Sequence, residues 1–153
     1  MKVGKKKHLG KEEKQRILSN LTSLLSRESF VVFAYVHGSF LSSKGFHDLD
    51  VAVYVEDDTL EANMHSFQYD LTLASQIDLA LPGITIDLRL LNTAPLNFRY
   101  RVVNIGRLLL SKDERKHIAF VAKTRDFFFD FEPHRRLLYE TIVLGRRHGQ
   151  KTK

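Results

Sequence analysis

Two apolar runs, separated by a Gly-Ser pair at positions 38–39, constrain the fold most strongly. The first run, residues 30–37, is apolar almost throughout, which is typical of a central strand buried on both faces. The second run, residues 48–56, opens with an Asp-Leu-Asp sequence. Strand side chains alternate between faces, so this sequence places Asp48 and Asp50 on one face, roughly 6.6 Å apart along the strand.

A third carboxylate extends the pattern. Residues 84–90 read ITIDLRL, with apolar side chains at the even positions and polar ones at the odd positions. This alternation predicts a half-buried strand with Asp87 on its polar face. If that strand pairs beside the one carrying Asp48 and Asp50, three carboxylates meet on one patch and repel each other unless a cation lies between them. Carboxylate oxygens are suitable ligands for a hard divalent cation such as Mg²⁺.

The order of these residues resembles the nucleotidyltransferase superfamily of DNA polymerase beta, whose pattern is a Gly-Ser pair, then Asp-x-Asp, then a later Asp. The matching residues here are Gly38, Ser39, Asp48, Asp50 and Asp87. The small size and the segments 87–95 and 104–110 are similar to the minimal nucleotidyltransferases, which are often antitoxins encoded beside a HEPN-domain toxin. The resemblance covers most of residues 12–144.

This resemblance implies an α/β (α+β) fold, a small mixed β-sheet covered by helices. It also implies an enzyme that transfers AMP from ATP to a hydroxyl, expected to be a tyrosine of a HEPN toxin. Gly38 and Ser39 would bind the nucleotide, because a residue without a β-carbon lets phosphate oxygens approach the backbone. The catalytic residues that would hold Mg²⁺, two ions in this family's chemistry, are Asp48, Asp50 and Asp87. Whether Asp87 is also the general base is left open.

An alternative is a non-catalytic antitoxin that neutralises a HEPN toxin by stoichiometric binding. The three aspartates favour the enzyme, because a pure binder has no physical need for a cluster of like charges. The short chain offers no second domain for an acceptor, so we expect the acceptor to be a separate protein. The nucleobase preference and the oligomeric state are not specified by the sequence.

Composition limits the other possibilities. The 153 residues contain no cysteine, which excludes a disulfide framework and thiolate metal sites. We expect a flexible basic tail over 1–11, one domain over 12–147 and a short tail over 148–153. The Lys and Arg residues at the two ends carry more positive charge than the net charge of +6 of the whole chain, so the sequence between the ends is slightly acidic. We therefore do not expect direct nucleic-acid binding. No apolar run is long enough to span a membrane, and we expect a cytoplasmic protein.

The remaining periodicities predict helices and one short strand. Helices are expected over 12–27, 60–81, 95–104, 113–131 and 134–146, with Pro133 separating the last two, and a short edge strand over 107–110. The second of these helices should bury a stripe made of Leu60, Met64, Phe67, Leu71, Ala74, Ile77 and Leu81.

A few other residues have weaker claims to the site. Of these, His37 is expected to be packed, Arg89 to pair with a carboxylate, His47 to support Asp48, and Lys44 to be solvated. The aromatic residues at 127–131 cannot all face inward from one helix, so part of them should be exposed as a surface for a partner or for a second copy of the chain.

Overall fold

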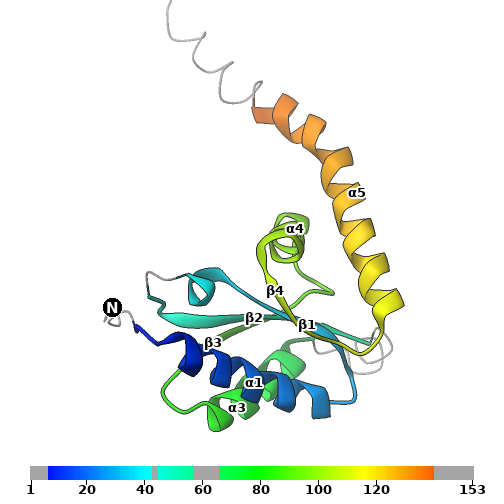
Figure 1. Ribbon diagram of the computed structural model, residues 1–153. Helices are drawn as coiled ribbons and strands as arrows, with labels where there is room; N and C mark the ends of the chain where they lie inside the picture. Colours follow the sequence, from blue (N-terminus) through cyan, green and yellow to red (C-terminus); the bar gives the residue numbers. More distant parts are fainter. Residues whose placement is uncertain (1–6, 43–44, 57–65, 140–153) are drawn as a thin grey trace, which may run out of the picture.

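The computed structural model describes residues 7–42, 45–56 and 66–139. Its centre is a mixed four-stranded sheet in the order β3-β2-β1-β4 (Figure 1). The strands are β1 (Val31–His37), β2 (Asp48–Val55), β3 (Thr85–Leu90) and β4 (Arg107–Ser111). Strand β1 is antiparallel to both β2 and β4, and β2 is parallel to β3.

Helices cover both faces of this sheet (Figure 1). They are α1 (Lys11–Arg27), the short 3₁₀ helix η1 (Gly38–Leu41), α3 (Ser66–Ala80), α4 (Leu96–Ile105) and α5 (Glu114–Tyr139). Helices α1 and α3 pack on one face, against the odd-numbered apolar residues of β2. Helix α4 and the first half of α5 pack on the other face. The α/β (α+β) architecture predicted from the sequence is therefore confirmed.

The strand predictions hold to within one or two residues, and the helices expected over 12–27 and 95–104 are α1 and α4. The edge strand expected over 107–110 is β4, which pairs with the central strand β1. These elements have strong local patterns, and their packing agrees with those patterns. Within the described ranges, no helix is both long and apolar enough to cross a membrane.

The helix expected over 60–81 corresponds to α3, and its predicted buried stripe is wrong at one position. Leu71 is 52% exposed, whereas Leu73 is fully buried together with Ile77. The buried face also carries Tyr69, whose ring lies 5.0 Å from that of Phe30 at the entrance to β1. The sequence contains apolar residues on two faces of this helix, and the contact with the sheet selects one of them. Leu60, Met64 and the side chain of Phe67 lie outside what the structure describes.

The expected break at Pro133 is also wrong, because α5 continues through it to Tyr139. A proline inside a helix removes one backbone N–H and usually kinks or ends the helix. Here the surrounding residues are largely exposed, so water can satisfy the carbonyl that loses its donor. The remainder of the helix expected over 134–146 lies outside the described residues.

The aromatic segment of α5 is divided as expected. Phe128 stacks on Tyr100 of α4 with ring centroids 3.5 Å apart, whereas Phe127, Phe129 and Phe131 are all more than half exposed. Beyond this point α5 extends away from the sheet (Figure 1). The helix therefore leaves an exposed apolar surface.

Of the expected tail over 1–11, the structure describes residues 7–11. Lys7 forms an isolated β-bridge with Phe46, in which the Lys7 N–H donates to the Phe46 carbonyl at 2.8 Å and the Phe46 N–H donates back at 3.1 Å. Helix α1 then begins at Lys11. The segments 1–6 and 148–153 lie outside the described residues.

Candidate functional site

The strand register brings the predicted carboxylates together. Asp50 of β2 lies directly opposite Asp87 of β3, and on its other side it lies opposite His37, the last residue of β1. Asp48 lies two residues before Asp50, on the same face of β2, and pairs with Thr85 of β3. The intervening residue, Leu49, is fully buried in the core on the opposite face. The three carboxylates thus share one face at one end of the sheet.

Gly38 fits tightly against Asp50. Its φ of +73° is in the left-handed region that favours glycine, and a β-carbon at this position would lie 2.1 Å from Asp50 Oδ2. The turn after β1 therefore passes directly beside the central carboxylate of the patch. Ser39 follows on an exposed position of η1. The predicted nucleotide-binding pair and the predicted carboxylates consequently belong to one surface.

The turn that carries Gly38 and Ser39 is held in place by contacts with the core and with α1. Phe40 is buried and packs edge-on against Phe46 at 4.8 Å. The Lys14 ammonium of α1 donates to the carbonyl oxygens of Phe40 and Ser42, both at 2.7 Å. Lys14 is a support that the sequence did not reveal, because its partners are backbone groups more than 20 residues away along the chain.

Electrostatic strain is concentrated at Asp50. Partial burial raises the pKa of its carboxyl group, and the negative charges of Asp87 and Asp48 raise it further. The positive charges of Arg101 and Arg89 oppose this shift. The ionised form of Asp50 is therefore less stable than that of a solvated aspartate, and a bound cation would relieve that cost.

His37 is packed, as expected from its place at the end of an apolar strand. The side chain is 7% exposed, and its ring meets the Phe98 ring edge-on with centroids 5.2 Å apart. Burial lowers the pKa of His37, with a further contribution from Arg101 that is opposed by Asp87. A neutral imidazole at the side of Asp50 adds no positive charge to the patch.

Two arginines flank the carboxylates. The guanidinium groups of Arg89 and Arg101 lie 5.3 and 5.7 Å from the centre of the Phe98 ring. Arg89 Nε also lies 3.7 Å from Asp87 Oδ1, which confirms the expected ion pair. No local pattern in the sequence indicates Arg101, because its place beside the carboxylates depends on α4 crossing the same face of the sheet. His47 is exposed, and Lys44 lies outside the described residues.

The donor set of the site suits a hard cation. Within residues 7–42, 45–56 and 66–139, no three His, Asp or Glu side chains are already arranged to hold a metal ion. The three aspartates nevertheless lie on one face of two paired strands, and the negative charges of Asp87 and Asp48 both raise the pKa of Asp50. Oxygen ligands of this kind are those that Mg²⁺ prefers.

Comparison with known families agrees with this arrangement. The family model described as polymerase beta, nucleotidyltransferase matches residues 19–115, which is more than half of the chain and includes all five predicted site residues. Comparison with curated proteins gave no significant match.

Several solved structures share the fold. A chain in the structure of a tri-AMPylated Shewanella oneidensis HEPN toxin in complex with MNT antitoxin is 22% identical, with a TM-score of 0.61 over 85% of this chain and 98% of that one. A chain of the MntA-HepT toxin-antitoxin structure is 21% identical, with a TM-score of 0.60 over 84% and 98%. A toxin-antitoxin structure with AMP-PNP also matches at 21% identity, with a TM-score of 0.61 over 82% and 98%.

Proposed function

Because the chain belongs to the polymerase beta nucleotidyltransferase family, we propose that it is a Mg²⁺-dependent enzyme that transfers AMP from ATP to a tyrosine hydroxyl of a HEPN-domain toxin. It would thereby act as the antitoxin. The observation that carries this proposal is the register of Asp50 opposite Asp87, with Gly38 packed against the Asp50 carboxylate. The fold-level similarity to a chain in a complex whose toxin is AMPylated supports the choice of reaction and acceptor.

The residues have separate roles in this proposal. Asp48, Asp50 and Asp87 would hold Mg²⁺, which supplies charge neutralisation at the triphosphate and activation of the attacking hydroxyl. Gly38 and Ser39 would position the phosphates, with the missing β-carbon and the exposed hydroxyl facing the nucleotide. Arg89 and Arg101 would add positive charge beside the carboxylates, where negative charge accumulates during transfer.

The transfer itself is a substitution at the α-phosphorus of ATP. The tyrosine oxygen forms a bond to this phosphorus, the bond to the bridging oxygen breaks, and pyrophosphate leaves. The hydroxyl proton passes to solvent or to a carboxylate of the site. Positioning the acceptor beside the nucleotide is the second contribution of the protein, because a correctly held pair reacts far faster than a free one.

Stoichiometric neutralisation is the second candidate, and the exposed part of α5 offers the docking surface that it requires. Phe127, Phe129 and Phe131 are each more than half exposed, and further along the helix so are Leu137, Leu138 and Tyr139. Exposed apolar surface of this kind marks a protein interaction site. The same surface would serve the enzyme as a docking face, so the two candidates differ only in whether the bound toxin is modified.

Nucleotide binding tests the site assignment. Calorimetric titration with ATP should show binding that requires Mg²⁺ and that weakens at least about 100-fold in the double variant Asp48→Asn/Asp50→Asn. The cause is the loss of two of the carboxylates that would hold Mg²⁺ beside the triphosphate. Asp78→Asn, at an exposed position of α3 away from the site, should bind like the wild type. Equal affinity in the double variant with EDTA present would refute the assignment.

A further inference from the structure

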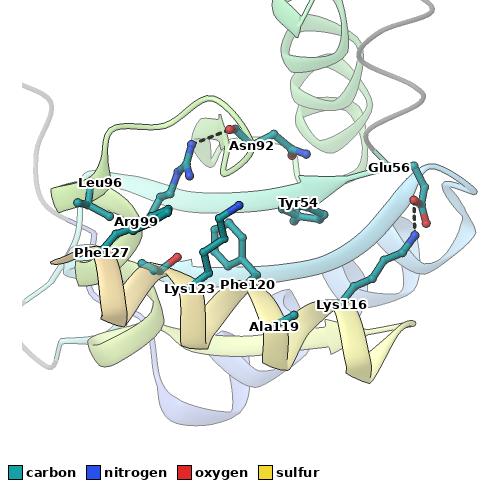
Figure 2. A pocket seen from close by; sticks show the side chains of 11 residues that line it. Tyr54, Glu56, Asn92, Leu96, Arg99, Lys116, Ala119, Phe120, Lys123 and Phe127 are labelled. Carbon is teal, nitrogen blue, oxygen red and sulfur yellow. Dashed lines mark hydrogen bonds and ion pairs between the residues drawn. The ribbon is translucent and has the colours of Figure 1, made fainter. Parts of the chain in front are cut away.

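A cavity lies on the same face of the sheet as the carboxylates and away from them. It has a volume of about 380 Å³, is open to solvent on one side, and is lined by residues of β2, α4, the first half of α5 and the loop after β3 (Figure 2). That volume lies in the range of cavities that bind small molecules. Tyr54, at its floor, is four residues beyond Asp50 on the same strand, a distance of roughly 13 Å. The cavity is thus separate from the candidate catalytic site.

Aromatic rings form much of its wall. The rings of Tyr54 and Phe120 lie 5.1 Å apart, and Tyr54 also stacks on Phe33 at 4.7 Å, which fixes the floor. Phe127, on the next turns of α5, lines the cavity with its ring half exposed. A flat apolar group could therefore pack in the cavity against rings that are held by the core beneath them.

The polar groups of the wall leave two positive charges without an acidic partner. Arg99 donates from Nη2 to the Asn92 carbonyl at 2.7 Å, but its buried Nε has no hydrogen-bond acceptor among the described residues. Lys123 forms no ion pair with any residue that the structure describes, and its ammonium lies 5.6 Å from the centre of the Phe127 ring. Figure 2 shows both side chains extending from their helices into this region.

The third cation of the wall is already neutralised. Lys116 lies 2.5 Å from Glu56 at one end of the cavity, and this hydrogen bond raises the pKa of the lysine. The loop that closes the other side is held by the Asn92 side chain, which accepts from the Val55 N–H at 3.0 Å and donates to the Val55 carbonyl at 2.9 Å. The cavity is therefore preformed, with its unmatched positive charge at Arg99 and Lys123.

We propose that this cavity binds a small aromatic anion of the nucleoside monophosphate class. The aromatic ring packs against Phe120 and Phe127, and the anionic group meets the Lys123 ammonium and the Arg99 guanidinium. Neither cation forms an ion pair with an acidic side chain among the described residues, and guanidinium groups are well suited to phosphate oxygens. This site would need no divalent cation, because its charges come from the protein itself.

AMP is the probe for this proposal, titrated into the full-length protein in EDTA and followed by calorimetry and by amide chemical shifts of α5. AMP should bind in the wild type and equally in Asp48→Asn/Asp50→Asn, because the cavity does not use those carboxylates. Lys123→Glu should weaken binding at least about tenfold, whereas Arg115→Glu, at an exposed position of the same helix outside the cavity, should change it less than about twofold. Adenosine and inorganic phosphate, each lacking one half of the ligand, should both bind more weakly than AMP.

Two results would overturn the proposal. One is an absence of AMP binding to the wild type in EDTA. The other is AMP binding that is lost in Asp48→Asn/Asp50→Asn and retained in Lys123→Glu, which would place the nucleotide at the carboxylates alone. Lys123→Gln, which removes the charge without reversing it, gives the same comparison if the Glu variant melts at a lower temperature than Arg115→Glu. Since the probe is used without metal, this experiment can fail while Mg²⁺-dependent ATP binding succeeds.

Discussion

Replacement of Asp87 by asparagine is expected to reduce AMP transfer by about 10²- to 10³-fold or more while leaving the fold intact. Asp87 lies opposite Asp50 in the register, so its carboxylate is part of the charge that would hold the metal. Its ion pair with Arg89 joins two side chains that are about half exposed, and such pairs contribute little to stability. Removing the charge also removes repulsion from Asp50.

The measurement compares the initial transfer rate with labelled ATP and the melting temperature in EDTA. Asp78→Asn is the matched control, because it makes the same chemical change at an exposed site on α3. A variant at position 87 that melts several degrees lower and still transfers AMP would show that Asp87 is structural.

Gly38→Ala is expected to remove most transfer activity, and Gly83→Ala is not. Both glycines have positive φ values, +73° and +83°, so an alanine at either one costs about 1–2 kcal/mol of backbone strain. At Gly83 nothing lies within 4 Å of the added β-carbon. At Gly38 the β-carbon would be 2.1 Å from Asp50 Oδ2, so the Asp50 carboxylate has to turn away. We expect a similar loss of stability in the two variants and a loss of transfer of at least about tenfold in Gly38→Ala alone.

Chemical denaturation measures the cost of backbone strain in each alanine variant, and the transfer assay measures the effect of displacing the Asp50 carboxylate. Equal activity in the two alanine variants, at equal stability, would show that the contact between Gly38 and Asp50 has no role in the reaction. A crystal structure of Gly38→Ala would locate Asp50 directly.

The sequence predicted the sheet and the shared face of the carboxylates because both follow from a period of two along the chain. Alternation in β2 and β3 decides which side chains point to the core, and this is a local property. The parallel pairing of these strands then brings Asp50 opposite Asp87. The alternation alone does not predict the register between β2 and β3, because that register depends on the path that α3 takes between the two strands.

Other features depend on contacts between distant segments. The buried face of α3 contains Leu73 rather than Leu71 because of the way the helix meets the sheet, and α5 continues through Pro133 although proline usually ends a helix. Arg101 reaches the site only because α4 crosses the sheet beside Phe98. The cavity around Arg99 and Lys123 combines two helices and a strand, so no single segment of the sequence indicates it.

The most direct test of the proposed activity combines this protein, ATP labelled at the α-phosphate, Mg²⁺ and a HEPN-domain protein encoded beside it. We expect the label to appear on the HEPN-domain protein, mass spectrometry to locate added AMP on a tyrosine, and the Asp48→Asn/Asp50→Asn variant to transfer none. If the HEPN-domain protein stays unmodified while the wild-type chain still blocks its toxicity, AMP transfer is not the activity of this protein, and stoichiometric neutralisation replaces it.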